Sequence, residues 1–196
     1  MQVFLSGIAL GFSIAVPPGP VNALAAQQVL TRSWFAGWSV LLGATTADGI
    51  FFVLTYYGVV TFVGPAVVHV LFVVGGAFML FLSVSTLLRA RRPQDVRATA
   101  RSGLPYLLGL SVGLTNPYQL GWWLAVGTGM VEEFGGAVVA GFFTGIVTWT
   151  LLFSTMVRAG VARYSSLYLA VIYASGVIMA AFGLWFLGLG LLTLLL

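Results

Sequence analysis

The chain is divided into six long apolar runs that are separated by short polar connections. The runs cover residues 3–30, 34–60, 66–88, 104–131, 135–157 and 167–196. Each is longer than the roughly 20 apolar residues that a helix needs to cross a bilayer. Only 6% of all residues are charged, whereas a soluble domain has about 25%, so lipid is expected to surround the fold. The sequence therefore predicts an all-α integral membrane protein with six transmembrane helices in a single domain, residues 1–196.

The first apolar run has some features of a signal peptide, with Ala23-Leu24-Ala25 as a candidate cleavage site. However, no basic residue precedes this run, and three prolines interrupt it before that site. Both features are untypical of signal peptides. We therefore expect the segment to remain in the mature protein as the first transmembrane helix.

The distribution of arginine predicts the orientation of the helices. All eight basic residues are arginines, and each lies in an odd-numbered connection. They are Arg32 in the first, Arg89, Arg91, Arg92, Arg97 and Arg101 in the third, and Arg158 and Arg163 in the fifth. The fourth connection contains Glu132 and Glu133 instead. Because short basic loops stay in the cytoplasm, we expect both termini on the non-cytoplasmic side (N-out, C-out). The positive charge indicates orientation and not a nucleic-acid partner.

The two halves of the chain share a pattern. Gly7 and Gly11 precede a proline cluster in the first run, and Gly109 and Gly113 precede a proline in the fourth. Many transporters consist of two repeats of opposite orientation. We therefore predict an inverted 3+3 repeat, in which residues 1–88 form repeat one and residues 104–196 form repeat two. A cytoplasmic linker, residues 89–103, would join them.

Prolines interrupt the first helix of each predicted repeat. Pro17, Pro18 and Pro20 lie in the middle of the first run, and Pro117 follows Asn116 in the fourth. A proline inside a helix removes a hydrogen bond and clashes with the preceding turn. In hydrocarbon, such irregular backbone is tolerated only where it is buried in protein or lines a polar cavity. We therefore expect helices 1 and 4 to be broken, although a packing kink also explains Pro117.

Each break begins a new half-helix near the middle of the membrane, and the N-terminus of a helix favours an anion such as a carboxylate. The predicted substrate-binding residues are Pro17, Pro18, Gly19, Pro20, Asn22, Asn116, Pro117, Gln119, Trp122 and Trp123. Helix capping is an adequate alternative for Asn22 and Gln119. Simple packing is an equally good alternative for Trp122 and Trp123.

Asp48 is the one acidic residue within any predicted span. A charge at the centre of a membrane helix costs about 2.5 to 3.5 kcal/mol on insertion scales, so such residues are functional candidates. We expect Asp48 to carry a proton or to act as counter-ion for an ammonium group. The structural alternative is a protonated carboxyl that bonds Thr45 or a carbonyl freed by the first break.

Several classes of function are disfavoured. With no cysteine and one histidine, His69, neither a thiol site nor a transition-metal site is expected. No Ser, His and acid arrangement and no phosphate-binding loop are present, so we predict neither an enzyme nor a cofactor. Gly141 and Gly145 suit either internal helix packing or a homodimer.

The segment Gly7–Gly11 followed by Val16–Ala23 resembles the first-helix signature of the LysE/RhtB amino-acid exporters, in which a Pro-x-Gly-Pro or Pro-Gly-Pro break is typical. Asp48, within Ala47-Asp48-Gly49, matches the acidic position of that family's second helix. Thr115-Asn116-Pro117 matches its fourth-helix Asn-Pro. The length of the chain and its helix count fit the family as a whole.

This resemblance implies a small exporter of amino acids or related solutes in a prokaryotic cytoplasmic (inner) membrane, working in exchange for protons. Members that export basic amino acids have an acidic residue shortly after the Asn-Pro, where this chain has Gly121-Trp122-Trp123. Lysine or arginine export is therefore disfavoured, and a neutral or aromatic amino acid stays open. Two alternative functions are a transporter or channel for inorganic cations and a structural membrane subunit.

Overall fold

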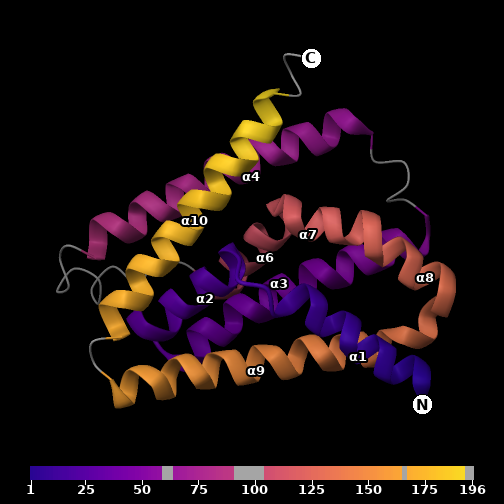
Figure 1. Cartoon of the computed structure of the whole chain (residues 1–196), viewed down its shortest axis with the longest axis horizontal. Helices are drawn as coiled ribbons and strands as arrows, with labels where there is room; N and C mark the ends of the chain where they lie inside the picture. The colour runs from indigo at the N-terminus through magenta and orange to yellow at the C-terminus, as the bar shows by residue number, and fades with distance from the viewer. Residues whose placement is uncertain (59–63, 91–103, 165–166, 193–196) are drawn as a thin grey trace.

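The computed structural model describes residues 1–58, 64–90, 104–164 and 167–192, and these residues contain no strand. The α-helices are α1 (Gln2–Ala15), α2 (Pro20–Thr31), α3 (Trp34–Tyr56), α4 (Pro65–Ala90), α6 (Pro105–Thr115), α7 (Pro117–Trp122), α8 (Thr128–Phe134), α9 (Val139–Arg163) and α10 (Leu167–Leu192). A π-helical segment, Trp123–Gly127, joins α7 to α8, and a 3₁₀ turn, Gly135–Val138, joins α8 to α9. The predicted all-α class is confirmed (Figure 1).

Several helices are suited to cross a membrane. By length and composition, three stretches qualify, namely α3, the run Pro117–Arg163 and Leu169–Leu191 of α10. The pair α1 and α2 also qualifies when taken together, although its two members are bent by 76° relative to each other. Phe72–Leu88 of α4 and the whole of α6 are apolar but shorter. The chain is thus an all-helical membrane protein, while the count of six spans stays a prediction.

The run Pro117–Arg163 reverses direction at Gly135, and Figure 1 shows the turn between α8 and α9. Gly135 has φ of 58°, a backbone conformation that glycine adopts without steric cost. The predicted fourth connection at Glu132 was therefore placed slightly too early, because residues 132–134 form the end of α8. The run is therefore not one continuous helix.

Two other predicted boundaries were wrong. Helix α9 continues to Arg163 and includes Arg158, which was expected in a connection. A long, charged side chain can extend to the membrane surface while its backbone stays helical, so charge alone does not end a helix. Helix α3 ends at Tyr56 and not at Val60. The predicted linker lies outside the described residues from 91 to 103, as do residues 61–63 of the second connection.

The helices pack in three pairs, which are α1 with α9, α3 with α6, and α4 with α10 (Figure 1). Glycines allow close approach in the first pair. Gly141 and Gly145 face the backbone of Phe4 and Ile8, and a Cβ on Gly11 would overlap the carbonyl oxygen of Phe142. Gly141 and Gly145 therefore serve internal packing, the first of the two alternatives that the sequence left open.

The neighbouring residues also give the relative directions of the paired helices. Phe4 lies opposite Gly141 and Ile8 opposite Gly145, so α1 and α9 run parallel. In the second pair, Gly109 faces Val40 and Gly113 faces Ala44, so α3 and α6 are also parallel. In the third pair, Gly183 faces Leu80 and Gly176 faces Leu87, so α4 and α10 are antiparallel.

The first predicted break is confirmed. Helix α1 ends at Ala15 and α2 begins at Pro20, with non-helical backbone between them. Gly19 is extended, with φ of −153°, and Pro20 occupies the first turn of α2, where a missing N–H leaves no bond unmade. The proline cluster thus ends one half-helix and starts the next, as its chemistry predicts.

The second predicted break is also present. Helix α6 ends at Thr115, Asn116 has extended backbone with φ of −82° and ψ of 107°, and α7 begins at Pro117. The side-chain oxygen of Asn116 accepts a hydrogen bond of 3.1 Å from the Tyr118 N–H. The break is therefore a capped helix start and not merely a kink.

Candidate functional site

A cavity of about 250 Å³ lies where the two breaks meet α3, α9 and α10. Its walls are formed by Ile14, Ala15, Pro17, Pro18, Gly19, Pro20, Val21, Asn22, Leu41, Ala44, Thr45, Asp48, Asn116, Tyr118, Gln119, Ile146, Trp149, Thr150, Phe182 and Trp185. A wider hollow of about 650 Å³, bordered by Thr46 and Tyr106, contains no carboxyl group. The first cavity joins helix breaks with a carboxyl group and is therefore the candidate functional site.

Asp48 is the carboxyl group in this cavity. It lies on α3 and is only 5% exposed. Its Oδ1 accepts hydrogen bonds from Nε2 of Gln119, at 2.7 Å, and from Nε1 of Trp123, at 3.0 Å. Within the described part of the chain, no hydrogen bond reaches Oδ2. Asp48 therefore has one oxygen fixed by the protein and one available to a ligand or a proton.

Both hydrogen-bond donors to Asp48 follow the second break. Because Asn116 starts a new helix, Gln119 and Trp123 lie one turn apart on α7 and the π-helical segment that follows it. Gln119 also donates to the carbonyl oxygen of Ala44, at 3.2 Å. Gly127 leaves room for the indole of Trp123, since a Cβ there would overlap the ring. The break between α6 and α7 thus places two hydrogen-bond donors beside the carboxylate of Asp48 on α3.

Asn22 satisfies the backbone at the first break. Its Nδ2 donates to the carbonyl oxygens of Ala15, at 2.9 Å, and of Pro17, at 3.0 Å. Both side-chain hydrogens of Asn22 are therefore occupied. The first N–H groups of a helix have no partner inside it, so α2 presents the N–H groups of Val21 and Asn22 at the cavity wall.

The two breaks are not equivalent as anion sites. At the start of α7, the Asn116 side chain already accepts from the Tyr118 N–H, and α7 has only 6 residues. At the start of α2, Gly19 provides no side-chain cap, and the helix has 12 residues. The α2 end therefore offers more free donors and a longer helix dipole for an anion than the α7 end.

The cavity brings together eight of the residues that the sequence singled out. They are Pro17, Pro18, Gly19, Pro20, Asn22, Asp48, Asn116 and Gln119. The other three, Pro117, Trp122 and Trp123, are not in its walls. Trp123 acts on the site through Asp48, whereas Trp122 donates to Oγ of Ser13 at 3.2 Å and packs on Phe142. His69 lies on α4 and takes no part in this cavity.

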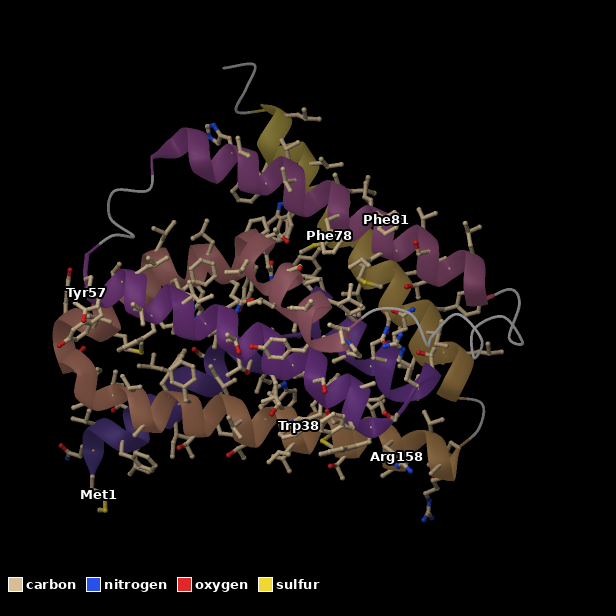
Figure 2. All side chains as sticks on the ribbon, turned by 180° about the vertical axis from the view of Figure 1, so that it is seen from behind. Met1, Trp38, Tyr57, Phe78, Phe81 and Arg158 are labelled. Atoms are coloured by element: carbon tan, nitrogen blue, oxygen red, sulfur yellow. The ribbon has the colours of Figure 1, made fainter. Side chains whose placement is uncertain are left out.

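Sequence patterns missed the walls that α9 and α10 contribute. Trp149 and Thr150 come from α9, and Phe182 and Trp185 come from α10. Thr150 is 2% exposed and accepts a hydrogen bond from Nε1 of Trp38, at 3.2 Å. Figure 2 shows Trp38 on α3, on the side toward α9. An apolar run contains aromatic residues both where it faces lipid and where it lines a cavity, so no sequence pattern indicated these positions.

Comparison with known proteins identifies the family. The sequence matches the model of the LysE type translocators over residues 12–196. A Bacillus subtilis (strain 168) protein named "Putative amino acid efflux protein YcgF" is 29% identical over 203 residues, which cover 95% of each chain. No solved structure matches the chain. The matched residues include both breaks and Asp48. The protein is therefore a translocator and not an enzyme. The chain belongs to the LysE type translocator family.

Proposed function

We propose that this translocator exports amino acids or related small zwitterions across the cytoplasmic (inner) membrane of a prokaryotic cell, in exchange for protons. The observation that carries the proposal is a single buried carboxyl group, Asp48, in a cavity between two helix breaks. Family membership supports transport as the activity, and the B. subtilis relative is named for amino acid efflux.

The polar groups in the cavity complement a zwitterion. The carboxylate of an amino acid would bind the N–H groups at the start of α2, where the helix dipole favours an anion. Its ammonium group would bind the open Oδ2 of Asp48. Each charge of the substrate then has an opposite partner, which is necessary because an unpaired charge is unstable in an apolar site.

Competition at Asp48 would couple transport to protons. A proton and the substrate ammonium group would occupy the same oxygen, Oδ2, because Oδ1 is already bound by Gln119 and Trp123. Substrate would leave on the outer side when Asp48 takes up a proton. The proton would be released on the inner side before the next substrate binds. Such exclusive occupancy makes the exchange obligatory.

Helix pairing supports the inverted 3+3 repeat. If α1–α2, α3 and α4 correspond to α6–α8, α9 and α10, the α1–α9 contact corresponds to the contact between α6 and α3. The third helices of the two repeats, α4 and α10, then form a pair that corresponds to itself. The pairs α1–α9 and α3–α6 are parallel, and the pair α4–α10 is antiparallel. Six spans that cross the membrane in alternating directions require these relative directions.

The proposed N-out, C-out orientation has one further support. In Figure 2, Met1 and Tyr57 lie at one end of the molecule, and Arg158 lies at the opposite end. The first end also carries Glu132 and Glu133 on the exposed surface of α8. Because basic residues favour the cytoplasmic side, Arg158 would face the cytoplasm and Met1 the outside.

An inorganic cation transporter on the same scaffold is less well supported. Divalent ions are held by several oxygen, nitrogen or sulfur ligands. Among the described residues, no three His, Cys, Asp or Glu side chains lie close enough to hold a metal ion. Asp48 alone provides one carboxylate, which suits a single ammonium group or proton better than a dehydrated metal ion.

Transport in proteoliposomes tests the proposal. With the membrane potential clamped at zero and an acidic lumen, vesicles containing the protein are expected to accumulate a labelled amino acid as protons leave. One pH unit supports up to about tenfold accumulation for one proton per substrate. Protein-free vesicles are the control, and a protonophore should abolish accumulation. Exchange that ignores the pH gradient would contradict proton coupling, and no exchange of any amino acid would contradict the function itself.

The hydrogen bond from Trp123 gives a second prediction. Trp123→Phe keeps an aromatic ring beside Phe142 and Phe52 but removes the N–H that donates to Asp48. A hydrogen bond to a charged group contributes about 1.5–3 kcal/mol, so proton-driven transport should fall by about tenfold or more. Trp34→Phe is the matched control, since its N–H bonds Thr155 away from the cavity. Equal activity of the two variants would contradict a role for Trp123.

A further inference from the structure

The charges of the cavity limit which amino acids it can bind. Of the wall side chains that belong to the described residues, only Asp48 and Tyr118 are ionisable, and none is basic. Once Asp48 is paired with the α-ammonium group, a cationic substrate side chain finds no second carboxylate. An anionic side chain finds no arginine, lysine or histidine. A charge without a partner is strongly disfavoured in a site of low dielectric.

The hydrogen bonds of the cavity limit polar side chains as well. The hydroxyl groups of Thr45 and Thr150 donate to carbonyl oxygens of their own helices, those of Leu41 and Val147. Gln119 donates to Asp48 and Ala44, and both side-chain hydrogens of Asn22 are engaged. These four side chains therefore have no donor left for the amide or hydroxyl group of a substrate.

Trp149 adds apolar surface to the cavity wall. Among the described residues, its Nε1 has no hydrogen-bond partner and essentially no accessible surface, so the N–H is not open to the cavity. The indole therefore contacts a ligand as an apolar ring.

Apolar surface makes up the remaining walls. Apolar wall residues come from four helices. They are Ile14 of α1, Leu41 of α3, Ile146 of α9, and Phe182 and Trp185 of α10. We propose that this cavity selects neutral amino acids with an apolar side chain of about leucine size. This inference rests on the proposed function and adds the substrate class. The volume of about 250 Å³ is just below the 300–1,000 Å³ typical of ligand pockets, which suits so small a solute.

Isosteric amino acids provide the sharpest test. In proteoliposomes that counterflow labelled leucine, unlabelled leucine should compete at least about tenfold better than asparagine, which replaces two methyl groups by an unpaired amide. It should compete at least about 100-fold better than aspartate. Norleucine should also compete at least about 100-fold better than lysine, its charged analogue. From alanine to norleucine, each added methylene should raise the affinity about fourfold.

The outcomes separate this inference from the exporter function. If asparagine, aspartate or lysine competes as well as its apolar isostere, the substrate class is wrong while amino acid export stands. If no amino acid exchanges, both are wrong. Rising competition along the alkyl series with rejection of the charged isosteres would support the inference.

Discussion

Asp48→Asn is expected to abolish proton-driven export. Asparagine has nearly the same shape and keeps an oxygen that can accept from Gln119 and Trp123, so the fold should be preserved. It carries no negative charge for an ammonium group and binds no proton at neutral pH. Removing one partner of a buried ion pair costs about 3–5 kcal/mol, which corresponds to a loss of transport of at least about 100-fold. Accumulation of labelled amino acid in proteoliposomes with an acidic lumen measures this loss.

A second carboxylate provides the control. Glu132→Gln removes the same charge from an exposed position on α8 and should leave transport within about twofold, because surface charges contribute little. The thermal stability of both variants should be measured to confirm that they are folded. If Asp48→Asn transports as well as the unmodified protein under a pH gradient, Asp48 has no part in coupling.

The features of the site that were predictable from sequence are those with a local cause. A proline beyond the first turn interrupts a helix, so Pro17 to Pro20 were sufficient to predict the gap between α1 and α2. A lone carboxyl in an apolar run is stable only away from lipid, so burial of Asp48 followed from its neighbours in the sequence. These two arguments point to segments that line the cavity of the structure.

The features that were not predictable depend on contacts between distant segments. The bond between Trp123 and Asp48 joins residues that are 75 positions apart. Whether Trp149 faces lipid or the cavity is decided by the rotation of α9, and both surroundings favour the same apolar residue. No sequence pattern indicated the π-helical segment that begins at Trp123, the residue that donates to Asp48. Thr45, which the sequence offered as a partner of a protonated Asp48, donates its hydroxyl to Leu41, and the described residues show no hydrogen bond between Thr45 and Asp48.

Helix ends were predictable only approximately, for a related reason. Composition shows where a chain leaves the hydrocarbon, but the helical backbone continues for as long as its hydrogen bonds are favourable. Helix α9 therefore extends through Arg158 to Arg163, whereas α8 ends at Phe134, because the positive φ of Gly135 reverses the chain. Charge indicates the membrane boundary, and backbone conformation determines the end of the helix.

Gly11→Ala and Gly109→Ala are expected to destabilise the protein strongly and by similar amounts. A Cβ on Gly11 would overlap the carbonyl oxygen of Phe142, and one on Gly109 would overlap that of Val40. Each obstacle is backbone of a packed helix and cannot turn aside as a side chain can, so the paired helices must separate. Overpacking typically costs about 1–3 kcal/mol, which lowers the melting temperature by roughly 2–12 °C for a chain of this length. Thermal unfolding of the purified protein in detergent measures the change.

The matched control is Gly121→Ala, because nothing lies within 4 Å of a Cβ at that helical position. Alanine favours a helix more than glycine does, so this variant should melt at the same temperature or slightly higher. The comparison also tests the repeat, since Gly11 belongs to the contact of α1 with α9 and Gly109 to the contact of α6 with α3. In an inverted repeat these contacts are equivalent, and equal losses are expected. A large loss at one glycine with none at the other would show that the two interfaces differ, and would contradict the symmetry on which the proposed architecture depends.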